Sequence, residues 1–157
     1  MDDTNYFKQT SGWTISQRAD STLPGYLIVA AKRKTSELWS LPAEELTELG
    51  SLLGVAQRAL METLGAKRVY IGRYGHTAGH SFHFHIIPIY DWIEDMFASD
   101  ERYRLLQSFA DPDFGTEPDG AELTLYVWRE FCESRHPPQV RGPTVSEAIA
   151  LLRERLM

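Results

Sequence analysis

The chain has 157 residues, of which 43% are hydrophobic and 24% charged, and its formal net charge is −6. This length fits one domain that buries a sizeable core, and we expect a single domain over residues 1–157. The negative charge argues against a nucleic-acid polymer as partner, and no apolar run approaches the roughly 20 residues that would span a bilayer.

The cysteine content and the first residues indicate where the protein works. Cys132 is the only cysteine, so an internal disulfide is impossible. The first four residues, MDDT, carry no apolar signal segment. Both features predict a protein of the reducing cytoplasm without a membrane partner.

Turn residues and apolar periodicity predict the elements of the first half of the chain. Residues 13–17 and 26–31 are expected to be strands, the second of them buried. A long helix follows, with Ser40 as its cap, Pro42 in its first turn and Gly65 just past its end. Its apolar face repeats at helical spacing through Leu46, Leu49, Leu53, Ala56, Leu60 and Leu64.

The second half of the chain gives mixed signals. Strands are predicted over 69–72 and 82–89, a helix over 100–109 and a loop over 111–120. Apolar alternation predicts a further strand over 123–128. The sequence T-V-S-E at 144–147 is a capping box that opens a last helix. This order favours an α+β fold, an antiparallel sheet with a long central helix and a C-terminal helix packed against it.

Histidines are concentrated beside and within the strand at 82–89. Four of the five lie between residues 76 and 85. Side chains of a strand alternate between its faces, so His83 and His85 point the same way as Ser81. The opposite, core-facing set is Phe82, Phe84 and Ile86.

Two imidazoles on one strand face suit chemistry on phosphate. A neutral imidazole is a good nucleophile near pH 7, and its attack on phosphorus divides a difficult displacement into two easier ones. A second histidine can bind a phosphate oxygen or the leaving group. Gly79 lets backbone N–H groups come close to a phosphate.

Several segments resemble the histidine triad (HIT) superfamily, in the family's order, over about residues 13–90. The segment SFHFHIIP at 81–88 resembles the signature in which three histidines alternate with apolar residues. The segment LPGYLIVAAKR at 23–33 is similar to the family's PGH–strand–KR segment. LPAEELTELG at 41–50 and AGH at 78–80 are similar to further family motifs. Residues 91–157 lack such a match and are expected to be a subgroup-specific extension.

The resemblance implies a nucleotide hydrolase or nucleotidyl transferase that acts at the α-phosphate of a conjugate, such as a dinucleoside polyphosphate or a nucleoside phosphoramidate. His83 matches the nucleophile, which would form a covalent nucleotidyl-histidine. His85 matches the histidine that contacts the phosphate and leaving group. The resemblance implies neither a metal nor a cofactor, a nucleotide as the partner, and a homodimer.

The chain departs from the family pattern around these histidines. Ser81 stands at the first triad position, whose histidine orients the nucleophile. The turn before it is shorter, which makes His80 a candidate replacement or phosphate contact. Arg18 lies where relatives often have Asp or Asn for the ribose hydroxyls, and together with Gly79 it is a candidate substrate-binding residue.

Two other functions stay open on the sequence. One is a nucleotide-binding module of the same fold with little or no catalysis, which the serine at position 81 favours. The other is a zinc site formed by His76, His80, His83 and His85, since closely spaced histidines can hold that metal.

Overall fold

A five-stranded antiparallel sheet with the order β1-β2-β3-β5-β4 organises the protein. The computed structural model describes residues 5–74, 79–108 and 120–156. The strands are β1 Tyr6–Gln9, β2 Trp13–Gln17, β3 Leu27–Ala31, β4 Arg68–Gly72 and β5 His83–Ile89. The helices are η2 Leu38–Ser40, α1 Ala43–Leu64, α2 Asp91–Ser99, η3 Glu101–Tyr103, α3 Arg104–Gln107, α4 Ala121–Trp128, the π-turn η5 Arg129–Glu133 and α5 Val145–Leu156.

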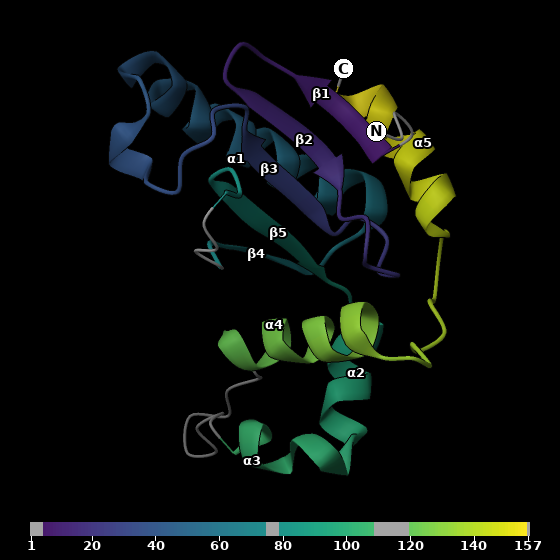
Figure 1. Cartoon of the computed structure of the whole chain (residues 1–157). Helices are drawn as coiled ribbons and strands as arrows, with labels where there is room; N and C mark the ends of the chain where they lie inside the picture. Colours follow the sequence, from purple (N-terminus) through teal and green to yellow (C-terminus); the bar gives the residue numbers. More distant parts are fainter. Residues whose placement is uncertain (1–4, 75–78, 109–119, 157) are drawn as a thin grey trace.

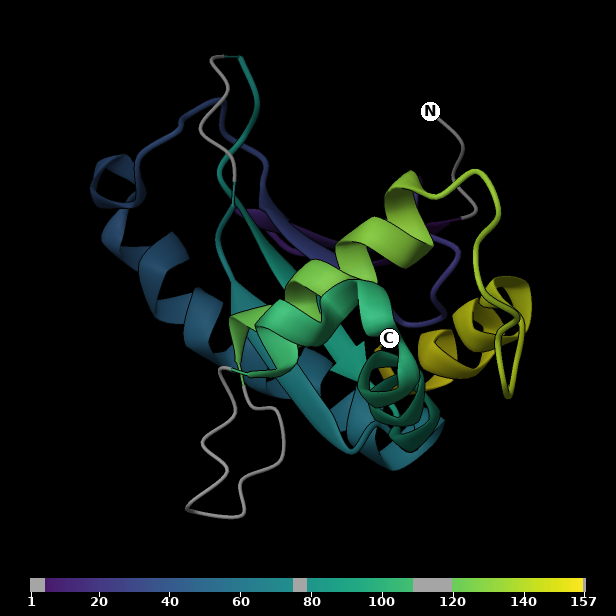
Figure 2. The same cartoon turned by 90° about the horizontal axis from the view of Figure 1, so that it is seen from below.

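Helices surround the sheet on different sides. The long helix α1 packs against β3, β4 and β5, and α5 packs against α1 and β1. Helix α4 contacts α2 and runs along the β4–β5 side of the sheet (Figures 1 and 2). The last helix therefore packs against the first strand (Figure 1).

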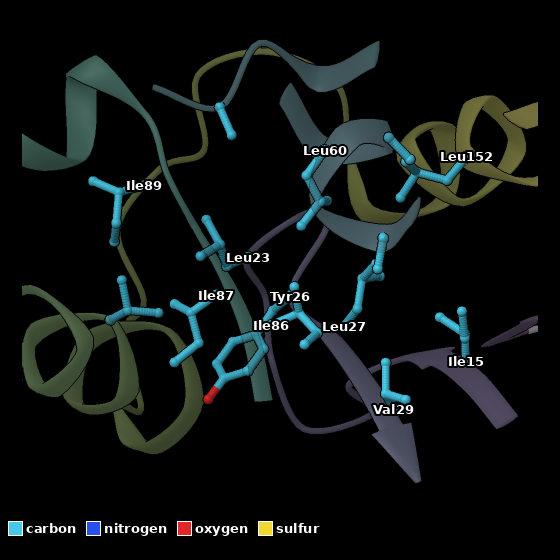
Figure 3. Packing of buried hydrophobic residues seen from close by; sticks show 14 of the residues in the cluster. Ile15, Leu23, Tyr26, Leu27, Val29, Leu60, Ile86, Ile87, Ile89 and Leu152 are labelled. Atoms are coloured by element: carbon cyan, nitrogen blue, oxygen red, sulfur yellow. The ribbon is translucent and has the colours of Figure 1, made fainter. Parts of the chain in front are cut away.

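The hydrophobic core lies between the sheet and α1 and continues through buried residues of α2 and α4. The burial of β2 and β3 alternates residue by residue, as expected for strands with one face against the core. Side chains from β3, β5 and α1 meet there, with Leu152 of α5 at one side (Figure 3). Phe82 and Ile86 are buried, and Phe84 packs against the core while it stays partly exposed.

The structure confirms the α+β class and most elements of the first half of the chain. The strands expected at 13–17, 26–31, 69–72 and 82–89 are present to within one residue. Helix α1 ends at Gly65, which has a φ of 70°. Glycine adopts this left-handed conformation without the steric penalty that a side chain causes. The capping box is present too, with reciprocal bonds between Thr144 and Glu147.

The strand expected at 123–128 is wrong, because this segment is the helix α4. Its buried residues are Leu123, Thr124, Tyr126 and Val127, which form one helical stripe. The Tyr126 ring packs edge-on against Phe97 and Tyr103 of the preceding helices. Tertiary packing therefore overrides the β-propensity of these aromatic and branched residues.

Other boundaries also differ from the expectation. Ser40 ends the short helix η2 and donates to the Glu37 carbonyl, so it does not cap α1. Pro42 is itself the cap position, one residue before the first turn. The helix expected over 100–109 is split into η3 and α3, and most of the loop expected at 111–120 lies outside the described residues. Strand β1 and helix α2 were not predicted.

Within the described ranges, no helix is both long and apolar enough to cross a membrane.

Candidate functional site

Strand register brings the candidate site residues to one face of the sheet. His85 on β5 pairs with Ile28 on β3 and with Gly72 on β4. Tyr26 precedes Ile28 by two residues and so shares its face. The Arg18 backbone N–H donates to the Tyr26 carbonyl at 2.7 Å, which places Arg18 opposite Tyr26. Paired residues of neighbouring strands point the same way, so these side chains converge.

The two strand histidines lie side by side on this face. Their ring centroids are 5.0 Å apart. His83 is partly exposed, whereas His85 is only 8% exposed. The expected same-face pair is thus present, with one imidazole facing the solvent and the other mostly enclosed.

The tautomer of His83 follows from its backbone partner. Its Nδ1 lies 2.9 Å from the carbonyl oxygen of Ser81. A carbonyl only accepts hydrogen bonds, so we assign the ring proton to Nδ1. The neutral ring then presents an unprotonated Nε2 with its lone pair available. Residue 81 orients this imidazole through its main chain, which a serine performs as well as a histidine.

The tautomer of His85 is the opposite one. The Tyr26 hydroxyl lies 3.1 Å from His85 Nδ1 and accepts a hydrogen bond from Arg18 Nη1 at 2.9 Å. The hydroxyl has one proton, and we assign it as the donor to Nδ1. His85 then carries its proton on Nε2, where it can donate to a ligand.

Burial favours the uncharged forms of both partners. Burial lowers the pKa of His85 to about 4, the charges of Arg18 and His83 act in the same direction, and Asp20 opposes them. Burial also raises the pKa of Tyr26 to about 12, although Arg18 opposes this shift. At neutral pH, His85 is therefore a neutral imidazole and Tyr26 a protonated phenol.

A cavity of about 610 Å³ opens over these residues. Arg18, Tyr26, Ser81, His83 and His85 line its sheet side. The residues that line it from helix α4 are Ala121, Thr124, Leu125 and Trp128.

The cavity has an apolar wall that could hold a planar ligand group. Leu125 and Trp128 are 43% and 41% exposed, and both lie on α4. Tyr74, which is 50% exposed, connects this wall to the histidines. Its ring centroid is 5.5 Å from that of His85, and its hydroxyl is 3.5 Å from Thr124 Oγ1.

Of the remaining predicted site residues, some line the cavity and others do not. His80 is exposed and lines it, as does Ser81. Gly79 has a φ of 90°, a conformation that glycine adopts without strain, but it does not itself line the cavity. His76 lies outside the described residues.

Sequence reasoning missed the residues that support the histidines. Tyr26 was regarded only as part of a strand, and Tyr74 was not considered. Gly72 was also missed, although a Cβ there would lie 2.9 Å from the Tyr74 ring. Trp128, which lines the cavity from α4, was not assigned to the site. The position of Arg18 opposite Tyr26 became clear only once β2 and β3 were paired.

The described part of the chain holds no group of three or more His, Cys, Asp or Glu side chains that could bind a metal. His83 and His85 direct their Nδ1 atoms at protein oxygens. The zinc alternative would need His76, about which the structure says nothing.

Comparison with solved structures identifies the fold. A zinc-bound histidine triad family protein from Mycobacterium smegmatis is 17% identical, with a TM-score of 0.55 over 96% of this chain and 82% of that one. A uridylyltransferase is 19% identical, with a TM-score of 0.57 over 99% of this chain and 42% of that one. The diadenosine triphosphate hydrolase of Plasmodium falciparum is 22% identical, with a TM-score of 0.52 over 73% of this chain and 81% of that one.

These similarities show that the chain has the histidine triad fold, which confirms the expected architecture. A match over 96% of the chain takes in most of residues 91–157, where no motif was recognised. No protein-family model and no curated protein matches the sequence.

Proposed function

We propose that this chain, which has the histidine triad fold, is a nucleotide hydrolase or nucleotidyl transferase that acts at the α-phosphate of a nucleotide conjugate. His83 is the nucleophile and forms a covalent nucleotidyl-histidine. His85 contacts the phosphate and the leaving group. No cofactor or metal takes part in this proposal.

The complementary tautomers of the two histidines carry the proposal. His83 has its proton on Nδ1, held by the Ser81 carbonyl, so its free Nε2 can attack phosphorus. His85 has its proton on Nε2, because Tyr26 donates to its Nδ1. One ring therefore presents a lone pair and its neighbour presents a hydrogen-bond donor, as a displacement at phosphorus requires.

The first step joins the nucleotide to the protein. His83 Nε2 attacks the α-phosphorus, a P–N bond forms, and the bond from phosphorus to the leaving atom breaks with its electron pair going to the leaving group. The imidazolium formed keeps its Nδ1–H on the Ser81 carbonyl, which spreads the new charge towards a backbone dipole. His85 Nε2–H donates to the phosphate oxygen or the leaving atom.

The second step releases the nucleotide. In a hydrolase, a water oxygen bonds to phosphorus, the P–N electron pair returns to His83 Nε2, and the water loses a proton to the solvent. In a transferase, a phosphate oxygen of a second substrate takes the place of the water. Both steps leave His83 in its starting form.

The cavity combines hydrogen-bonding groups with an apolar wall, as the phosphates and the base of a nucleotide require. His80 and Ser81 line the cavity, and the exposed backbone at Gly79 lies next to them in the chain, where these groups can bind phosphate oxygens. Trp128 and Leu125 provide an apolar surface for the base or for an apolar leaving group. His80 takes the role of a phosphate contact in this proposal, because Ser81 already orients His83.

An acid-labile adduct tests the proposal. The protein is incubated with diadenosine tetraphosphate labelled at the α-phosphorus, quenched in denaturant at alkaline pH, and examined for label that stays on the protein and is lost in acid. We expect such an adduct on the native protein and none on His83→Ala. The exposed His136→Ala variant is the control and should label like the native protein. Tight nucleotide binding without adduct or turnover would leave only a binding module.

The homodimer stays a prediction. Light scattering at micromolar concentration should give twice the mass of one chain, and a mass of one chain would contradict it.

A further inference from the structure

Arg18 lines the cavity and directs each of its three nitrogens at a protein group. Its Nε and Nη2 donate to the two carboxylate oxygens of Asp20 at 2.6 and 3.0 Å. Its Nη1 donates to the Tyr26 hydroxyl, and its guanidinium lies 5.0 Å from the centre of the Tyr26 ring. A planar guanidinium held by two oxygens on one side has a fixed orientation.

The bonds of Arg18 fix the donor and the acceptor along the hydrogen-bond chain from Arg18 through Tyr26 to His85. Arg18 can only donate, so the Tyr26 oxygen accepts from it, and we assign the one phenol proton to the bond with His85 Nδ1. Protonation of His85 Nδ1 would direct two hydrogen-bond donors, this N–H and the Tyr26 O–H, at each other. It would also place an imidazolium close to a guanidinium in a mostly enclosed site, where charges are poorly screened.

The other groups that face His85 do not offset the positive charge of Arg18. His83 lies beside it on β5, and Tyr74 lies beside it after β4. Among the described residues, Asp20 is the acidic group whose charge acts on His85, and both its oxygens are bound to Arg18. The residues that line the cavity from α4 carry no ionisable group.

We propose that Arg18 and Tyr26 are positioning residues that hold the proton of His85 on Nε2, and that the site therefore selects α-phosphate conjugates whose leaving group departs as an anion. This inference rests on the proposed function, because it deepens the role of His85 in the same reaction.

The selectivity follows from where protons are needed. When a P–O bond to a phosphate or polyphosphate breaks, the oxygen leaves with the electron pair as an anion, and a hydrogen bond from Nε2–H stabilises it. When a P–N bond breaks, the nitrogen must gain a proton to leave as a neutral amine. A neutral imidazole is a poor acid and does not supply that proton. The favoured substrates are thus nucleoside polyphosphates joined to a second phosphate-bearing group.

The tautomer can be measured without any turnover. Long-range ¹H–¹⁵N correlation spectra of the histidine rings should show His85 with an unprotonated Nδ1 and a protonated Nε2 from pH 5 to 8. In Arg18→Met the titration midpoint of His85 should rise above about 4, since the nearby positive charge is removed, but it should stay below 6.5 because the burial remains. Arg18→Lys keeps the positive charge but loses the planar set of guanidinium donors. Its His85 titration midpoint should lie between those of the native protein and Arg18→Met. Tyr26→Phe should mix the two tautomers.

Two matched variants control for the loss of similar bonds elsewhere. Arg102→Met removes a guanidinium that pairs with Asp100 in the same way and does not line the cavity. Tyr90→Phe removes a buried hydroxyl that donates to the Pro24 carbonyl at 2.9 Å. Both should leave the His85 spectrum unchanged.

Turnover completes the test. At pH 7 the ratio of kcat/KM for diadenosine tetraphosphate to that for adenosine phosphoramidate should exceed about tenfold in the native protein, and it should fall in Arg18→Met. If His85 carries its proton on Nδ1, or titrates near 6.5 in the native protein, the inference is overturned. If the spectra agree but neither substrate is turned over, the proposed function fails while the positioning by Arg18 and Tyr26 stands. Equal turnover of both substrates would contradict the selectivity.

Discussion

Gly72 lies directly opposite His85 in the β4–β5 pair, and the missing side chain leaves the space that Tyr74 occupies. A Cβ at position 72 would come within 2.9 Å of two ring carbons and the hydroxyl of Tyr74. That distance is shorter than van der Waals contact, so the ring would have to move. A glycine on one strand thus allows an aromatic ring to lie beside a histidine on the next.

We predict that Gly72→Ala lowers kcat/KM by about tenfold while the fold is retained. Tyr74 is half-exposed and can swing outward, so the free energy of unfolding should change by less than about 1 kcal/mol. The ring would then no longer border His85. Steady-state kinetics and thermal unfolding measure the two effects.

Gly54→Ala is the matched control for this substitution. Apart from its chain neighbours and the backbone of its own helix, no atom lies within 4 Å of a Cβ at Gly54, and the residue sits inside helix α1. Alanine is the better helix former by about 1 kcal/mol, so this variant should be more stable and fully active. An unchanged kcat/KM for Gly72→Ala would show that the place of Tyr74 has no bearing on the reaction.

Much of the site could be predicted because strand alternation is a local rule. The spacing of His83 and His85 placed both rings on one face, and the structure has them 5.0 Å apart. The apolar repeat of helix α1 and its terminal Gly65 were equally local signals. Such features need only a few neighbouring residues to be read.

The rest depends on pairings that no local window contains. Arg18 meets Tyr26 because β2 and β3 are in register, and Tyr26 meets His85 because β3 pairs with β5. The α4 wall was mistaken for a strand, since six residues with alternating apolar positions fit either element. Its helical state is fixed by Tyr126 packing on Phe97 and Tyr103, which are distant in sequence.

We predict that Trp128→Ala raises the KM for a nucleotide substrate by about tenfold and changes kcat little. The indole is 41% exposed in the cavity wall, and stacking of a base on an aromatic ring stabilises by about 1–3 kcal/mol. Trp39→Ala is the control, because that indole is 82% exposed on η2 and does not line the cavity. Equal KM values for the two variants would contradict a ligand-binding role of α4.

We predict that Thr144→Ala lowers the free energy of unfolding by about 1 kcal/mol, or the Tm by about 2–4 °C. Glu147 accepts from the Thr144 backbone at 2.8 Å and its own N–H donates to the Thr144 hydroxyl at 3.3 Å, so the variant loses part of the cap of α5. Thr47→Ala is the control. Its hydroxyl donates to the Ala43 carbonyl within the exposed part of α1, and alanine there should be neutral or slightly stabilising.

We predict that the protein loses stability in mild acid because of His85. Its pKa is about 4 in the folded state and 6.5 ordinarily, so the unfolded chain binds the extra proton between these values. Stability therefore is complete above pH 6.5 and declines as the pH falls towards 4, by up to about 3 kcal/mol for this one group. Urea unfolding from pH 7.5 to 4.5 measures the slope. His85→Gln should flatten it, whereas His136→Gln, at an exposed position, should not. The same slope in His85→Gln as in the native protein would show that other groups cause the acid sensitivity.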